Sequence, residues 1–116
     1  MIENYTMADL LDTLINERAS RIELQCGSQP RILDIPGEFG ALTGVLDVAP
    51  VTAQKAIELL QSIASPEQMR ELDLCGKTRF THIHSVTFGP QRIRVTGEVH
   101  HDDVTIHLEN AGTAGS

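Results

Sequence analysis

The stretch Arg79–Glu109, RFTHIHSVTFGPQRIRVTGEVHHDDVTIHLE, decides the fold. It predicts three consecutive antiparallel strands over Arg79–Val86, Arg92–His100 and Asp103–Glu109, with turns at 88–91 and 101–102. Apolar and polar residues alternate along the last two strands, and the apolar positions are Ile93, Val95, Val99, Val104, Ile106 and Leu108. A period of two is typical of a strand with one buried face and one exposed face.

The same pattern predicts how these strands pair. If His100 faces Asp103 around a two-residue turn, every apolar residue of the last two strands lies on one face, and a slip by one residue would expose them all. For the first turn we expect Thr87 to face Arg92, which places His84 and His82 on the apolar face as well. The opposite, polar face then carries Arg79, Thr81, Ser85, Arg92, Arg94, Thr96, Glu98, Thr105, His107, Glu109 and one apolar misfit, Ile83.

Helices and a hairpin are predicted before this meander. Thr6, with Asp9 three residues later, is typical of the start of a helix that runs to about Arg18. Its buried stripe is predicted to be Met7, Leu10, Leu11, Leu14 and Ile15. Ile22, Leu24 and Cys26 then alternate with polar residues as in a strand, and after a turn at 27–30 the chain returns along 31–35.

Two further helices follow residues 38–48, which carry two glycines and predict at most one short edge strand. Thr52 is the expected N-cap of a helix through Ala64, whose expected apolar stripe is Ala53, Ala56, Ile57, Leu60 and Ile63. Ser65 is the expected cap of the next helix, with Pro66 at its first position, and that helix ends near Gly76.

This order predicts the α+β class: a mostly antiparallel sheet, made of an N-terminal hairpin and a C-terminal three-stranded meander, with two to three helices on one face. We expect a single domain over residues 1–109 and a flexible C-terminal tail over 110–116.

Composition limits the function. The net charge of −7 argues against nucleic acid or an anionic membrane as partner, and the chain has no Trp, one Tyr and three Phe on which bases could stack. No basic and apolar signal segment is visible at the start, and no apolar run is long enough for membrane insertion, so we expect a cytoplasmic protein. For Cys26 and Cys75, partly buried reduced thiols are favoured over a disulfide.

The candidate catalytic and metal motifs are incomplete. Gly76-Lys77-Thr78 imitates the end of a phosphate-binding loop, but Glu71 replaces the first glycine and the order of helix and strand is inverted. His82 and His84 share a face without a third ligand, which favours two partly buried, neutral core histidines over a zinc site. The His100–Asp103 turn is interpreted as solvated rather than metal-binding. We therefore expect no catalytic residue, cofactor or metal.

Several short motifs occur in an order known from one family. They are Ala19–Leu24 followed by Gly27 and Pro30, Gly37-Glu38-Phe39, Val51-Thr52, Ser65–Gln68 and Arg92–Val95. In this order the chain resembles the N-terminal domain of twitching-motility secretion ATPases, the PilT-like type IV pilus retraction motors, over residues 7–108. It departs from that pattern at Arg21, Glu23, Leu33, His82 and His84, and Walker A and Walker B motifs are absent from the sequence.

The resemblance implies a PAS-like fold and a role in protein contacts. It favours a non-catalytic interaction or regulatory module in pilus or secretion machinery, whose partner is a type IV pilus or secretion ATPase or a second copy of the chain. A PAS-like sensor with a small ligand between sheet and helices is the alternative, and an enzyme has only the incomplete histidine set in its favour. The expected partner-binding residues are on the polar face: Ile83, Arg92, Arg94, Thr96 and His107.

Overall fold

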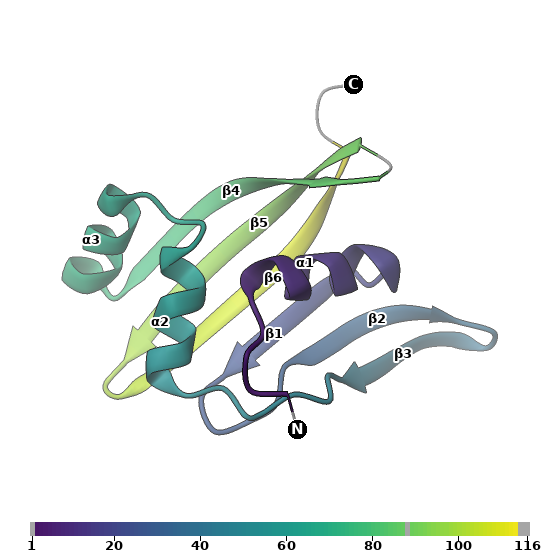
Figure 1. Cartoon of the computed structure of the whole chain (residues 1–116), viewed down its shortest axis with the longest axis horizontal. Coiled ribbons are helices and arrows are strands. Elements are labelled where there is room, and N and C mark those ends of the chain that lie inside the picture. The colour runs from purple at the N-terminus through teal and green to yellow at the C-terminus, as the bar shows by residue number, and fades with distance from the viewer. Residues whose placement is uncertain (1, 88, 114–116) are drawn as a thin grey trace.

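One six-stranded sheet forms the body of the protein. The structure, a computed structural model, describes residues 2–87 and 89–113. The strands are β1 (Arg21–Gln25), β2 (Arg31–Gly37), β3 (Gly40–Val45), β4 (Lys77–Val86), β5 (Gly89–His100) and β6 (Asp103–Thr113). All neighbours are antiparallel, in the order β3-β2-β1-β6-β5-β4, so the N-terminal hairpin joins the C-terminal meander where β1 pairs with β6 (Figure 1).

Three helices pack on one face of this sheet (Figure 1): α1 (Met7–Asn16), α2 (Ala53–Gln61) and α3 (Pro66–Cys75). The predicted caps are confirmed, because the Thr6, Thr52 and Ser65 side chains accept hydrogen bonds from backbone amides of the first turns. Thr6 with Asp9 and Ser65 with Gln68 form reciprocal capping boxes. The predicted α+β class is therefore confirmed. No helix in the ranges 2–87 and 89–113 is long and apolar enough to cross a membrane.

The core lies between the helices and the sheet. Met7, Leu10, Leu11 and Leu14 of α1 are buried, as the spacing predicted, and the largest buried side chains of the sheet are Ile22, Leu24, Ile93, Ile106 and Leu108. In α2 the buried residues are Ala56, Leu59 and Leu60, whereas the expected Ala53 is exposed. A Cβ at Gly97 of β5 would lie 3.0 Å from Leu60 Cδ1, so the absence of a side chain at Gly97 leaves room for Leu60 of α2.

The predicted register of β5 with β6 is confirmed, but that of β4 with β5 is wrong. His100 pairs with Asp103 and Val95 with Leu108, whereas Val86 pairs with Gly89 and Ile83 with Arg92. The four-residue turn expected at 88–91 is contradicted over 89–91, which belong to β5, and Phe88 lies outside the described residues. Gly89, the first residue of β5, takes a positive φ of 105°, which glycine adopts without strain. In the described part of the sheet Pro90 pairs only with β4, so its missing amide hydrogen is compatible with a place in the strand.

The predicted register of β4 with β5 is wrong by four residues. Because four is an even number, the side chains have different cross-strand partners but remain on the predicted faces of the sheet. His82 and His84 remain on the helix side, and Ile83, Arg92, Arg94 and Thr96 remain on the other.

The C-terminal tail begins later than we expected. Residues 110–113 continue β6, with Asn110 opposite Ile93 and Thr113 opposite Gln91. The tail expected from 110 is therefore wrong over these four residues, because the longer β5 supplies a partner for them. Residues 114–116 lie outside the described range.

Candidate functional site

The side of the sheet that faces away from the helices, here called the open face, gathers the basic residues. Because paired residues share a face, the register places six of the chain's nine Lys and Arg on it: Arg21, Arg31, Lys77, Arg79, Arg92 and Arg94. The register places the carboxylates of Glu23, Glu98, Glu109 and Asp103 on the same face, and Asp34, at the bulge of β2, lines a hollow together with Arg21 and Glu109. The open face is therefore net basic, and the rest of a chain of net charge −7 is strongly acidic.

Ion pairs link neighbouring strands across the open face. Arg94 Nη1 lies 3.2 Å from Glu109 Oε1, and Lys77 Nζ lies 3.1 Å from Glu98 Oε1. Hydrogen bonds from His100 and then Lys77 lower the pKa of Glu98. These pairs are solvent-accessible, so water and salt screen them and they contribute little to stability.

Three of the six cations have no such partner. Over residues 2–87 and 89–113, no carboxylate lies within 4.0 Å of the guanidinium groups of Arg31, Arg79 and Arg92. Their charge is available to an approaching anionic group.

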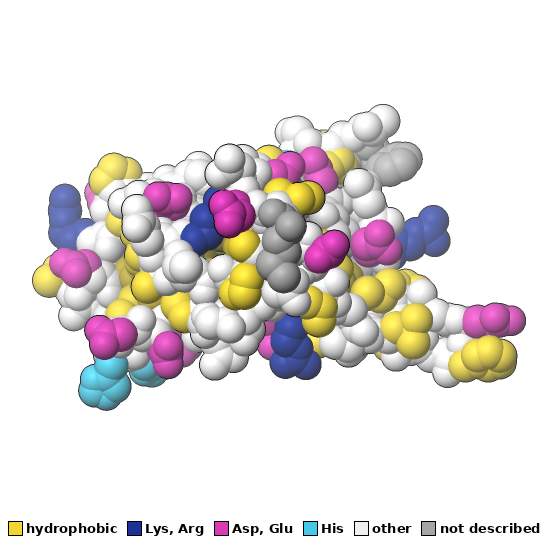
Figure 2. All heavy atoms as spheres, turned by 60° about the horizontal axis from the view of Figure 1, so that its bottom comes forward, with side chains coloured by type: hydrophobic (Ala, Val, Ile, Leu, Met, Phe, Trp, Pro, Cys, Tyr) yellow, Lys and Arg dark blue, Asp and Glu magenta, His cyan; other side chains and the backbone are white. Residues whose placement is uncertain are grey.

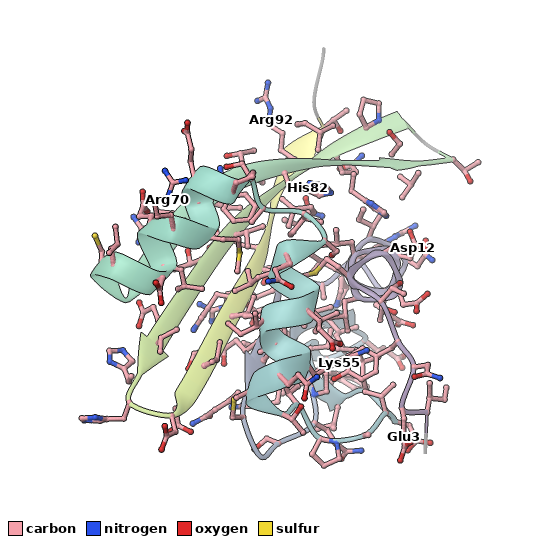
Figure 3. All side chains as sticks on the ribbon, turned by 60° about the vertical axis from the view of Figure 1, so that its left-hand side comes forward. Glu3, Asp12, Lys55, Arg70, His82 and Arg92 are labelled. Atoms are coloured by element: carbon pink, nitrogen blue, oxygen red, sulfur yellow. The ribbon has the colours of Figure 1, made fainter. Side chains whose placement is uncertain are left out.

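The predicted interaction residues all lie on the open face. Ile83 is 49% exposed and lies beside Arg92, while Thr96 lies opposite His107 as predicted. Pairing of Thr87 with Arg92 would have put Ile83 opposite Thr96, but the register of β4 is shifted and Ile83 lies opposite Arg92. Figure 3 shows Arg92 on one side of the β4–β5 strands and His82 on the other, the side of α1 and Asp12.

Sequence reasoning missed the part of this face that comes from β1 and β2. His107 Nδ1 on β6 lies 3.6 Å from Glu23 Oε1 on β1, and Arg31 pairs across from Glu23. The alternation of Arg21, Glu23 and Gln25 with apolar residues was visible, but no signal in the sequence indicated that β1 would pair with β6.

The two histidines on the helix side contact each other and α1. His84 Nε2 lies 2.7 Å from Asp12 Oδ1, and the ring centroids of His82 and His84 are 6.4 Å apart. Burial, and secondly the neighbouring His84, lower the pKa of His82 below its usual value, which agrees with the prediction of a neutral core imidazole. No group of three or more His, Cys, Asp or Glu in the described ranges is arranged to hold a metal ion.

The residues that imitate a phosphate-binding loop have structural roles. Gly76 ends α3 with a φ of 74°, Lys77 pairs with Glu98, and Thr78 is buried beside Gly97. The helix comes before the loop, as predicted, so α3 presents its C-terminus and not its N-terminus to this segment. Cys75 beside it is exposed rather than partly buried as expected, and both cysteines are free.

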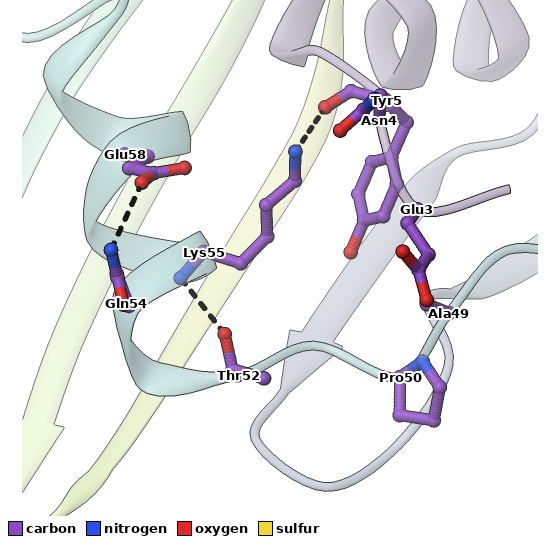
Figure 4. A pocket seen from close by; sticks show the side chains of 9 residues that line it. All are labelled: Glu3, Asn4, Tyr5, Ala49, Pro50, Thr52, Gln54, Lys55 and Glu58. Carbon is purple, nitrogen blue, oxygen red and sulfur yellow. Dashed lines mark hydrogen bonds between the residues drawn. The ribbon is translucent and has the colours of Figure 1, made fainter.

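Two concavities lie on the helix side. A groove of about 680 Å³ between α2, α3 and the β5–β6 turn has an apolar lining that includes Ile57, Met69, Leu72 and Val104. A smaller hollow of about 300 Å³ lies between α2 and the segment before α1 (Figure 4). There Lys55 Nζ donates to the Tyr5 carbonyl oxygen at 2.5 Å and lies 4.5 Å from the centre of the Tyr5 ring, which fastens the N-terminal segment to α2.

Comparison with known proteins identifies the fold. No family model matches the chain, and no curated protein matches it. The crystal structure of the pilus retraction motor PilT with bound ADP matches with a TM-score of 0.70 at 20% identity, over 91% of this chain and 29% of that chain. The Legionella pneumophila ATPase DotB matches with a TM-score of 0.71 at 20% identity, over 92% of this chain and 30% of that chain. The chain spans less than a third of each ATPase, and its resemblance to PilT-like ATPases is confirmed at the level of fold.

Proposed function

We propose that this chain is a non-catalytic, cytoplasmic interaction module whose open face docks an acidic surface of a pilus-type or secretion-type ATPase. The observation that carries the proposal is the separation of charge, with six of nine cations on the sheet face opposite the three described helices. The similarity to part of PilT and DotB supports the class of partner.

The composition of the open face suits a protein partner better than other anions. Arginine outnumbers lysine five to one among its cations, and Arg is enriched in protein interfaces whereas Lys is depleted. Ile83, exposed beside Arg92, supplies an apolar contact within the charged surroundings. The acidic remainder of the chain would be repelled by a nucleic acid or an anionic membrane, but it does not oppose an acidic patch confined to the open face.

The test compares two double variants that carry the same chemical change. Arg94→Glu with Ile83→Asp alters the open face, and Arg70→Glu with Leu74→Asp alters an exposed Arg and an exposed apolar residue on α3. Binding to the purified pilus-type and secretion-type ATPases of the same organism is measured by biolayer interferometry at low and moderate salt. We expect the open-face variant to lose at least about tenfold in affinity, and the control to bind like the parent.

Folding is checked in the same variants by urea unfolding. Because the Arg94–Glu109 pair is exposed, the urea midpoint of the open-face variant should correspond to a free energy of unfolding no more than about 1 kcal/mol below that of the parent. Equal binding by both variants would show that the open face is not the docking surface. An absence of binding by the parent chain to every such ATPase would overturn the assignment of the partner.

A small-ligand sensor is the second candidate, and the groove beside α3 favours it. The space between helices and sheet, where we had placed a ligand, is filled by buried side chains such as Leu60, Ile93 and Ile106. The groove of about 680 Å³ is instead lined by apolar residues that include Ile57, Met69 and Val99 and by the polar residues Asp73 and His101. Native mass spectrometry of purified protein tests this candidate, because a retained small molecule that is lost in Met69→Trp would support the sensor.

A further inference from the structure

The two edges of the sheet differ in their protection against pairing with another strand. β4, at one edge, carries Lys77 and Arg79, and charged side chains are a usual means of preventing edge-to-edge association. β3, at the other edge, reads Gly-Ala-Leu-Thr-Gly-Val over Gly40–Val45 and contains no charge and no proline. The β3 edge therefore lacks the charged side chains and the proline that protect many natural edge strands, and the bulge of this hairpin lies on β2.

Exposed apolar side chains gather at this edge. Phe39 at the β2–β3 turn is 98% exposed, Leu42 is 60% exposed and Val45 is 56% exposed. Figure 2, in which the bottom of Figure 1 comes forward, shows hydrophobic side chains along this hairpin as far as its projecting tip. Three large exposed apolar residues within seven positions are unlike the singly scattered ones of an ordinary surface.

The backbone of β3 presents its outer hydrogen-bonding groups at odd-numbered residues. The Leu46 amide donates to the Pro30 carbonyl oxygen, and Gly37 pairs with Gly40 around the two-residue turn. Along an antiparallel strand the N–H and C=O groups of successive residues point alternately to the two neighbouring sides. Since Gly40 and Leu46 bond to β2, the residues at the same parity between them, Leu42 and Gly44, bond to β2 as well. The N–H and C=O groups of Ala41, Thr43 and Val45 therefore point away from the sheet.

We propose that β3 pairs antiparallel with β3 of a second copy, with Thr43 opposite Thr43 on the two-fold axis, to join two six-stranded sheets. In this register Ala41 lies opposite Val45 of the other copy and Leu42 opposite Gly44, so each large side chain meets a small one. Among the possible registers, only the one with Thr43 on the axis pairs all three outward-facing residues, Ala41, Thr43 and Val45, with outward-facing residues of the second copy. Thr opposite Thr is a favourable cross-strand pair. This self-pairing does not depend on the proposed docking to an ATPase.

The charges at the two ends of β3 are compatible with this register. Glu38 and Asp47 flank the uncharged segment, and they come opposite Val48 and Phe39 of the second copy rather than opposite another carboxylate. The free edge ends where Val48 pairs with Ile2, which limits the association to the segment around β3. β3 itself carries no charge, so the chain's net charge of −7 is not concentrated at this edge.

The matched test places the same substitution at each edge. Thr43→Lys puts two lysines opposite each other on the proposed axis, whereas Thr81→Lys puts lysine on the exposed β4 edge. Sedimentation equilibrium of the parent up to about 0.5 mM should reveal a dimer, since even a Kd in the high micromolar range is then visible. We expect Thr43→Lys to remain a monomer and Thr81→Lys to dimerise like the parent.

Amide hydrogen exchange adds a readout at single residues. The amides of Thr43 and Val45 should become protected as concentration rises, whereas those of Leu42 and Gly44, bonded to β2, should be protected at every concentration. A parent chain that is monomeric at 0.5 mM would overturn the proposal. A dimer that survives Thr43→Lys, or one in which the odd-numbered amides gain no protection, would show that another surface associates.

Discussion

Replacing Gly97 with alanine tests how closely α2 packs on the sheet. The added Cβ would lie 3.0 Å from Leu60 Cδ1, 3.5 Å from Leu60 Cδ2 and 3.7 Å from Thr78 Cγ2. Carbon atoms pack best at about 3.5–4.0 Å, so Leu60 has to move by roughly 0.5 Å or more. Leu60 is fully buried and has no free space to move into without displacing its neighbours.

The expected change in the free energy of unfolding of Gly97→Ala is the sum of two opposing contributions. Overpacking a core costs about 1–3 kcal/mol, and alanine returns about 0.4–1 kcal/mol by restricting the unfolded chain. We therefore expect Gly97→Ala to lower the free energy of unfolding by about 1–2 kcal/mol. Urea unfolding at equilibrium measures this as a lower midpoint with an unchanged m-value.

A double-mutant cycle identifies the contact responsible. Leu60→Ala alone should cost about 2–5 kcal/mol, because it leaves a cavity above Gly97. In that background the methyl group of Gly97→Ala occupies part of the cavity, so it should cost nothing or restore some stability, which gives a coupling energy of at least about 1 kcal/mol. An equal cost of Gly97→Ala in both backgrounds would refute the placement of α2 over this glycine.

Two further outcomes are expected. NMR titration should give His82 a pKa below 6.5, so neutral His82 stabilises the fold above about pH 6.5 and stability falls as pH drops from there toward the folded-state pKa. His82→Phe should flatten the pH dependence of the urea midpoint in that window, and an unchanged slope would contradict this reasoning. Calorimetry with ATP and Mg²⁺ should show no saturable heat, because Lys77 lies on a strand and pairs with Glu98; micromolar binding that disappears in Lys77→Ala would overturn this expectation.

Local signals predicted the elements of this fold well. Helix starts at Thr6, Thr52 and Ser65 were correct because a cap needs only a hydroxyl and amides within the next three residues. The assignment of faces in the meander was correct for a similar reason, since alternation survives any even error of register. Both properties depend on residues that are close in sequence.

The remaining features depend on contacts between distant segments. Gly89 and Pro90 predicted a loop from their intrinsic preferences, but β4 offers pairing partners that keep both in a strand. The adjacency of β1 and β6 has no local signal at all, and without it the contribution of Glu23 and Arg31 to the open face could not be foreseen. The interaction residues were therefore placed on the correct face, while the extent and net charge of that face required the structure.

The pairing of β1 with β6 also has a consequence for synthesis on the ribosome. β1, β2 and β3 emerge first, but β1 receives its second neighbour only when Asp103–Thr113 has been made. Closing such a long loop costs entropy and slows the formation of a continuous sheet. A nascent chain that has not yet reached residue 103 exposes unpaired edges on both β1 and β3, so it is the species most prone to aggregate.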